Sequence, residues 1–186
     1  LNHILESIGK ASRDERIKGI YIEPGMIIAG HATIEEIRDA LADFKESGKF
    51  IVSFGSIYSQ KAYHLASVAD KVYLNPEGML DFQGLTAQRT FFKNTLEKLG
   101  VDMQIIRHGD YKSAVEPFTR TNMSEAAREQ TEAYVNSLWN HLTANVAESR
   151  ELSPEALNET ADQMPLFQNG DFLMRAKLID GLKYKD

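Results

Sequence analysis

The chain has 186 residues, of which 42% are hydrophobic and 26% charged, and its net charge is -6. This length is enough for one domain with a sizeable core, and the acidic balance gives no electrostatic reason to expect nucleic acid or an anionic membrane surface as a partner. The absence of cysteine excludes disulfides, thiolate metal sites and cysteine nucleophiles. Apolar stretches are only a few residues long, so no membrane span is predicted.

The first residues predict a helix, because Leu1, Ile4, Leu5 and Ile8 share one helical face. Since that face is present from the first residue and Leu1 is not an initiator methionine, we expect the chain to be a fragment of a longer protein. Residues 17–23, IKGIYIE, predict a buried strand that Pro24-Gly25 ends.

A helix, a strand, a helix and a strand follow in the predicted order. Thr33 with Glu36 predicts a capping box for a helix that stops near Gly48. Residues 50–54 predict a strand, 59–70 a helix, and 71–74 a third strand that Asn75-Pro76 closes.

The middle of the chain continues the alternation. Phe91, Phe92, Leu96 and Leu99 predict a helix ending at Gly100, and residues 101–106 predict another strand. Helices alternating with strands at this spacing indicate an α/β domain with a largely parallel sheet. Its site is expected in loops at the carboxyl ends of the strands, and Lys112 is predicted to lie in such a loop.

The last third, residues 123–186, predicts a mainly helical arm on a single domain that spans residues 1–186. Asn122 with Glu125 predicts the cap of a long helix whose apolar residues recur every three or four positions, up to Val146. Ser153-Pro154 predicts the start of another helix, and residues 171–179 a short one.

Most catalytic and cofactor motifs are absent. The five histidines show no pair at metal-ligand spacing, and no HExxH motif is present. There is no GxGxxG or GxxxxGK[ST] phosphate loop and no GxSxG nucleophile elbow. We therefore expect neither a metal nor a cofactor.

Lys112, within GDYKSAVEPF, is the candidate catalytic residue. A lysine can act as general base for a serine hydroxyl only when it is neutral, which requires desolvation. Lowering a lysine pKa from about 10.4 to about 7–8 corresponds to roughly 4 kcal/mol of differential interaction. Tyr111 and Phe118 flank Lys112 and are expected to shield its amine from water.

Two segments carry a family resemblance. GDYKSAVEPFTRTNMSEAARE, at 109–129, closely resembles the lysine motif of the signal peptide peptidase A family, also called protease IV, and SQKAYHLASVADKVYLNPEG, at 59–78, resembles its upstream helix and strand. The resemblance implies a Clp protease/crotonase-like βα superhelix and a serine endopeptidase that degrades cleaved signal peptides with a Ser–Lys dyad. Lys112 would be its general base.

The family also implies partners and a location. These are signal-peptide substrates, a homo-oligomer such as a tetramer-like ring, and the periplasmic side of the bacterial inner membrane. The membrane association would use a segment outside this chain.

The sequence departs from the family at the nucleophile. Alignment on Tyr63 and its neighbours puts Gln60 where the serine belongs, with Lys61 and Ala62 in place of two glycines. Gln60 cannot attack a carbonyl. The resemblance therefore implies the amino-terminal domain of the long, two-domain form, inactive alone and completed by a serine from its own C-terminal domain.

Three serines near these positions are alternatives to an external nucleophile. Ser59 is one residue from the expected position, which turns a helical side chain by about 100°, and it is disfavoured. Ser113 is expected to cap the helix after Lys112, and Ser56 is the third.

Two other functions stay open. A degenerate domain would serve only as an oligomerisation or peptide-binding scaffold, although the intact lysine motif argues against it. A crotonase-type acyl-CoA hydratase or isomerase would need a carboxylate base and an oxyanion-forming loop that the sequence does not reveal, and acyl-CoA binding would identify it.

Overall fold

The computed structural model describes residues 1–106 and 112–185, and its secondary structure confirms the predicted α/β class. The chain divides into two compact units: unit 1 joins Leu1–Gly84 to the residues from Leu142 onward, and unit 2 is Leu85–His141. The elements of the described residues are α1 (Asn2–Arg13), β1 (Gly19–Ile22), α2 (His31–Glu46), β2 (Phe50–Tyr58), α3 (Gln60–Ala66), β3 (Lys71–Leu80), α4 (Lys93–Lys98), η1 (Ser113–Val115), α5 (Glu116–Thr119), α6 (Glu125–Arg150), α7 (Pro154–Asp162), η2 (Pro165–Phe167), α8 (Gly170–Arg175) and β4 (Gly181–Leu182).

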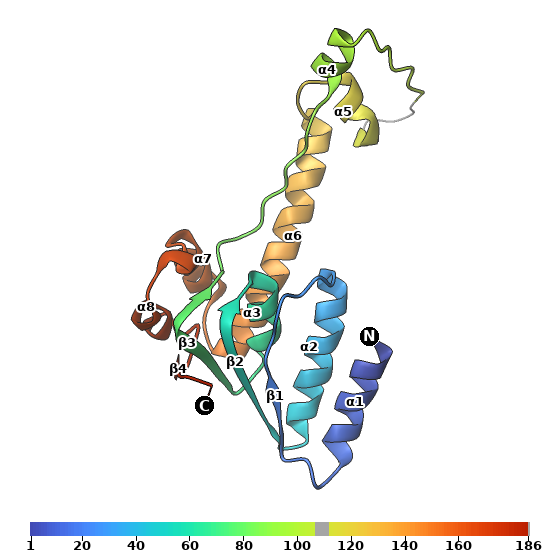
Figure 1. The fold of residues 1–186 in the computed structure, drawn as a ribbon. Coiled ribbons are helices and arrows are strands. Elements are labelled where there is room, and N and C mark those ends of the chain that lie inside the picture. Colours follow the sequence, from blue (N-terminus) through green and yellow to red (C-terminus); the bar gives the residue numbers. More distant parts are fainter. Residues whose placement is uncertain (107–111, 186) are drawn as a thin grey trace. The chain divides into compact units, whose positions relative to one another are not determined.

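Unit 1 is built on a parallel sheet, as predicted. In the described residues its strand order is β1-β2-β3-β4, and each neighbouring pair is parallel (Figure 1). Helix α1 packs on α2, and α8 packs on β3 and β4. The mainly helical C-terminal part therefore also adds a short strand to the sheet.

The core of unit 1 lies between the sheet and its helices. It is formed by fully or nearly fully buried apolar side chains that alternate along the strands or recur on one helix face, as burial of apolar surface requires. Examples are Ile34, Leu41, Phe44, Ile51, Val72, Leu74, Leu142, Val146, Leu157 and Leu173. The apolar stripes predicted for α2 and for the later part of α6 are confirmed.

The third strand is longer than predicted. Asn75-Pro76 does not close it, because β3 bulges between its pairings Gly55↔Leu74 and Ile57↔Met79 and then continues to Leu80. The Asn75 side chain accepts a hydrogen bond from the Glu77 N–H at 2.9 Å, which turns the backbone inside the bulge. A Cβ on Gly78 would lie 2.5 Å from the Ser56 carbonyl oxygen, so the bulge requires glycine there.

The strand predicted at 101–106 is wrong. These residues form neither helix nor strand, and unit 2 contains no strand among its described residues with which they could pair. A strand needs a neighbour to satisfy its backbone, and Ile106 is fully exposed. The expectation that Lys112 follows the carboxyl end of a strand is corrected with it.

Other boundaries differ for local reasons. Helix α2 begins at His31 with Gly30 as its cap, so the capping box at Thr33 is wrong. Ser124 rather than Asn122 caps α6, accepting a hydrogen bond from the Ala127 N–H at 3.2 Å. The cap at Ser153 is confirmed, with its hydroxyl accepting from the Ala156 N–H at 3.1 Å. Strand β1 is half-buried rather than buried, because it lies at an edge of the described sheet.

Two helices are shorter than their patterns predicted. Helix α3 ends at Ala66 rather than Asp70, and α8 ends at Arg175, with Lys177 in a left-handed conformation at φ 57° soon after. The helix ending at Gly100 is confirmed as α4, and this glycine adopts φ 69°. Such a conformation favours glycine and stops a helix.

Candidate functional site

Lys112 directly precedes η1 in unit 2, and its side chain is exposed. Tyr111, one of the two residues expected to desolvate it, lies outside the described residues. The other, Phe118, is 40% exposed and stacks on Phe92, with ring centroids 6.2 Å apart. The described residues of unit 2 therefore do not enclose the lysine.

The backbone after Lys112 is held by a buried carboxylate. Glu116, the first residue of α5, is fully buried, and its oxygens accept hydrogen bonds from the Ser124 N–H at 3.1 Å and hydroxyl at 2.5 Å. Ser124 in turn caps α6, so the negative charge lies where the helix dipole favours an anion. Glu116 thus ties the lysine segment to the start of the long helix.

A second set of contacts, made by Phe92, holds the same segment. The Phe92 N–H donates to the Pro117 carbonyl at 2.6 Å, next to the stacked rings of Phe92 and Phe118. Ser113, which was expected to cap the following helix, is instead the buried first residue of η1, and Val115 precedes α5. The EPF part of the lysine motif is therefore a local framework for Lys112.

Gln60 occupies the first position of α3 in unit 1 and is engaged in hydrogen bonds. Its Nε2 donates to the Gly84 carbonyl at 3.1 Å, and its Oε1 accepts from the N–H groups of Gln83 at 3.1 Å and Gly84 at 3.2 Å. The side chain thus stabilises a turn 24 residues further along the chain. A glutamine amide has no nucleophile for acyl transfer.

The neighbours of Gln60 are also committed to structure. Ser59 caps α3, accepting from the Ala62 N–H at 3.3 Å, and Lys61 donates to the Ala29 carbonyl at 2.9 Å. Because the Ala62 N–H already bonds to Ser59, it is not free to stabilise an oxyanion. The same hydrogen bond engages the hydroxyl oxygen of Ser59, so Ser59 is disfavoured as a nucleophile.

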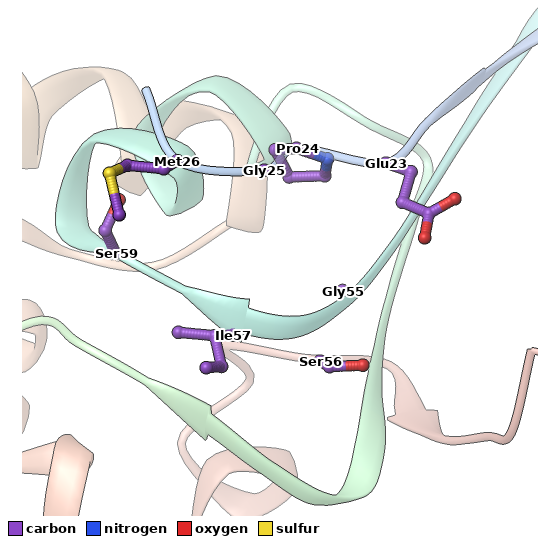
Figure 2. Close-up of a pocket in the computed structure, with 8 residues that line it drawn as sticks. All are labelled: Glu23, Pro24, Gly25, Met26, Gly55, Ser56, Ile57 and Ser59. Atoms are coloured by element: carbon purple, nitrogen blue, oxygen red, sulfur yellow. The ribbon is translucent and has the colours of Figure 1, made fainter. Parts of the chain in front are cut away.

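A pocket of about 590 Å³ lies beside the start of α3. Figure 2 shows it between the loop after β1, from Glu23 to Met26, and the end of β2, with Ser59 beyond. Pro24, Met26 and Ile57 give it apolar walls, and Ser56 is exposed along it. The Glu23 carboxylate at its edge pairs with Lys185 at 2.8 Å.

His31 is the first residue of α2, and the charge of Lys61 acts on its ring. Burial and then the charge of Lys61 hold the pKa of His31 below its ordinary value. The ring therefore favours the neutral form beside the ammonium of Lys61.

A model described as peptidase family S49 matches residues 43–186. The chain belongs to this family. Protease 4 of Salmonella typhi is 38% identical to it over 155 residues, which are 83% of this chain and 25% of that protein. The chloroplastic serine protease SPPA of Arabidopsis thaliana is 30% identical over the whole chain and 27% of its own length. The chain thus spans about a quarter of the length of the curated relatives it matches.

Among solved structures, a peptidase from Plasmodium falciparum shares the fold at a TM-score of 0.56 and 11% identity, covering 99% of this chain and 88% of that one. Family membership agrees with the resemblance of the two sequence segments, and the Plasmodium falciparum neighbour shows a shared fold alone. Among residues 1–106 and 112–185, none of the helices combines the length and apolar character that a bilayer crossing requires.

The sequence predicted Lys112 as the candidate catalytic residue and singled out position 60, but it gave no sign of Glu116 or of the partners of Gln60. A glutamate four residues after a lysine is typical of an exposed helix face, so its burial had no periodic signal. The bonds of Gln60 join residues distant in sequence. The Pro-Phe pair after Glu116 was the one available sign of local packing.

Proposed function

We propose that the chain is the lysine-donating half of a Ser–Lys dyad serine endopeptidase that degrades cleaved signal peptides. Lys112 is the general base, and the nucleophilic serine comes from a C-terminal domain of the same protein, outside this chain. The observation that carries the proposal is an intact lysine motif in a member of peptidase family S49 whose nucleophile position holds the hydrogen-bonded Gln60.

The chemistry sets the conditions that the missing half must meet. In the reaction the neutral amine of Lys112 takes the serine proton while the serine oxygen attacks the peptide carbonyl, and it later returns the proton to the leaving amine. The amine must therefore lose most of its water when the halves assemble. The exposed position of Lys112 leaves it accessible to such a partner.

The proposal extends to assembly and location. A homo-oligomeric ring and a place on the periplasmic side of the bacterial inner membrane, anchored by a segment outside this chain, go with this function. The second candidate is an inactive oligomerisation or peptide-binding scaffold, which the apolar pocket between the loop after β1 and the end of β2 favours.

Cleavage of a fluorogenic signal-peptide substrate by the full-length protein tests the proposal. Lys112→Ala should lower kcat/KM by at least about 10³-fold, as loss of a catalytic base does. The matched control is Lys98→Ala, an exposed lysine of the same unit, which should retain parental activity. Retained cleavage by Lys112→Ala would favour the scaffold.

A further inference from the structure

The turn at residues 83–84, to which Gln60 is hydrogen-bonded, lies at the boundary between the two units. Gly84 is the last residue of unit 1 and Leu85 the first of unit 2. From Asp81 to Phe92 the chain has neither helix nor strand, so regular backbone pairing does not hold this connection. The side chain of Gln60 donates one hydrogen bond and accepts two where the chain leaves unit 1.

The two connections between the units differ in kind. The second lies between His141 and Leu142, inside the continuous helix α6. A helix resists bending because consecutive turns are hydrogen-bonded. The first connection has Gly84 at φ 100°, a conformation that only glycine adopts at little cost. Because no helix or strand holds this connection, the hydrogen bonds of Gln60 supply support that regular backbone pairing does not.

Gln60 is well suited to this task because the backbone that carries its side chain is held in place. It begins α3, whose cap is Ser59, and the nearby Tyr63 is fully buried with its hydroxyl donating to the Leu178 carbonyl at 2.8 Å. Its amide both donates and accepts, which matches one carbonyl and two N–H groups. A serine in this position lacks the reach and the second polar atom, so one residue change both removes a nucleophile and supplies the clamp.

We propose that Gln60 is a positioning residue that clamps the turn at residues 83–84 and thereby fixes the point from which the chain leaves unit 1 toward Lys112. Its effect on catalysis rests on the proposed function of Lys112. The hydrogen bonds of the clamp lie within unit 1, so amide exchange at residues 83 and 84 measures them independently of catalysis.

The test uses the full-length protein with three variants. Gln60→Met keeps a side chain of similar length and removes all three hydrogen bonds, whereas Gln60→Glu keeps the oxygen that accepts from both N–H groups. Gln88→Met makes the same chemical change at an exposed glutamine of the connecting segment and serves as control. Amide hydrogen exchange at residues 83 and 84 and the kcat and KM for the fluorogenic peptide are measured.

We expect Gln60→Met to speed exchange at both amides by at least about tenfold, because their hydrogen bonds are lost. It should lower kcat by about 10- to 100-fold with KM unchanged, as a small displacement of a catalytic group does. Gln60→Glu should fall between Gln60→Met and the parent in both readouts, and Gln88→Met should match the parent.

Two results would overturn the proposal. Unchanged exchange in Gln60→Met means that the clamp does not hold the turn, and faster exchange with parental kcat means that the clamp does not position the catalytic lysine. Failure of the proposed function is seen separately, as full activity of Lys112→Ala. The catalytic part of the inference then falls with it, and exchange at 83 and 84 decides the clamp.

Discussion

Gln60 of unit 1 and Lys112 of unit 2, the two positions that the family resemblance singles out, are engaged differently in the structure. The amide of Gln60 makes three hydrogen bonds to backbone groups, whereas the side chain of Lys112 is exposed on a segment held by the buried Glu116. A side chain whose polar atoms are all committed to structure is not available for chemistry. An exposed one on a fixed backbone remains available to a partner.

The surroundings of the two residues differ in the same way. Unit 1 has a sheet, a buried apolar core and polar side chains whose bonds cross between elements, while the described part of unit 2 has short helices, an irregular segment and part of α6. We therefore expect substitutions of buried polar groups to cost unit 1 global stability and to cost unit 2 local order around Lys112.

The largest effect on stability is expected at Arg38 of α2. This buried guanidinium donates to the carbonyls of His64 and Asn145 and to the hydroxyls of Ser67 and Ser149, at 2.5 to 3.3 Å. Arg38→Ala removes four hydrogen bonds from this buried site and should lower the free energy of unfolding by about 3–5 kcal/mol. Denaturant unfolding measures it.

The control for Arg38 is Arg13→Ala, an exposed arginine of the same unit. It should change the unfolding free energy by no more than about 0.5 kcal/mol. Equal effects of the two changes would show that the buried network does not stabilise unit 1.

The next effect is expected at Glu116. Glu116→Ala removes the acceptor of two hydrogen bonds from Ser124, which should lower the local free energy of opening around residues 112–119 by about 1–3 kcal/mol. Amide exchange of this segment measures it. Glu132→Ala, on the exposed face of α6, is the control and should leave this exchange unchanged. Exchange in Glu116→Ala that matches the parent would contradict the anchoring role.

A smaller, pH-dependent effect is expected at Asp180. Burial would raise the pKa of this carboxyl, but hydrogen bonds from the Val72 N–H, Arg150 and Lys71, at 2.9, 2.9 and 3.1 Å, outweigh it and hold the pKa below its ordinary value. The carboxylate therefore stabilises the fold above the unfolded pKa, and this contribution is lost as the pH falls through the folded pKa.

Unfolding curves recorded from pH 7 to pH 2.5 test this sign. The parent should lose stability on acidification, and Asp180→Asn should lose less over the same range because it cannot gain that proton. An equal loss in parent and variant would show that Asp180 does not contribute to the acid sensitivity of unit 1.

Much of the fold was predictable because periodicity reports burial. The stripe of Ile34, Leu41 and Phe44 and the strands at 50–54 and 71–74 depend on local patterns, and the structure confirms them. The strand at 101–106 failed because a period-two pattern does not show whether a partner strand exists. Asn75-Pro76 looked like an end because a bulge uses the same residues as a turn.

For the candidate site, the residue types were predictable from the sequence and their contacts were not. Lys112 and the change at position 60 were visible as residue types within segments that resemble a family. The partners of Gln60 and the burial of Glu116 were not visible, since both depend on contacts between Gln60 and residues 83–84 or between Glu116 and Ser124. Sequence patterns identify the residues, and tertiary contacts determine what each can do.

The most direct test of the half-site account is labelling of the full-length protein with a fluorophosphonate that modifies activated serines, followed by mapping of the modified residue. The account predicts one labelled serine outside residues 1–186, and loss of its labelling in Lys112→Ala. Labelling at Ser56, Ser59 or Ser113, or labelling that persists in Lys112→Ala, would contradict it.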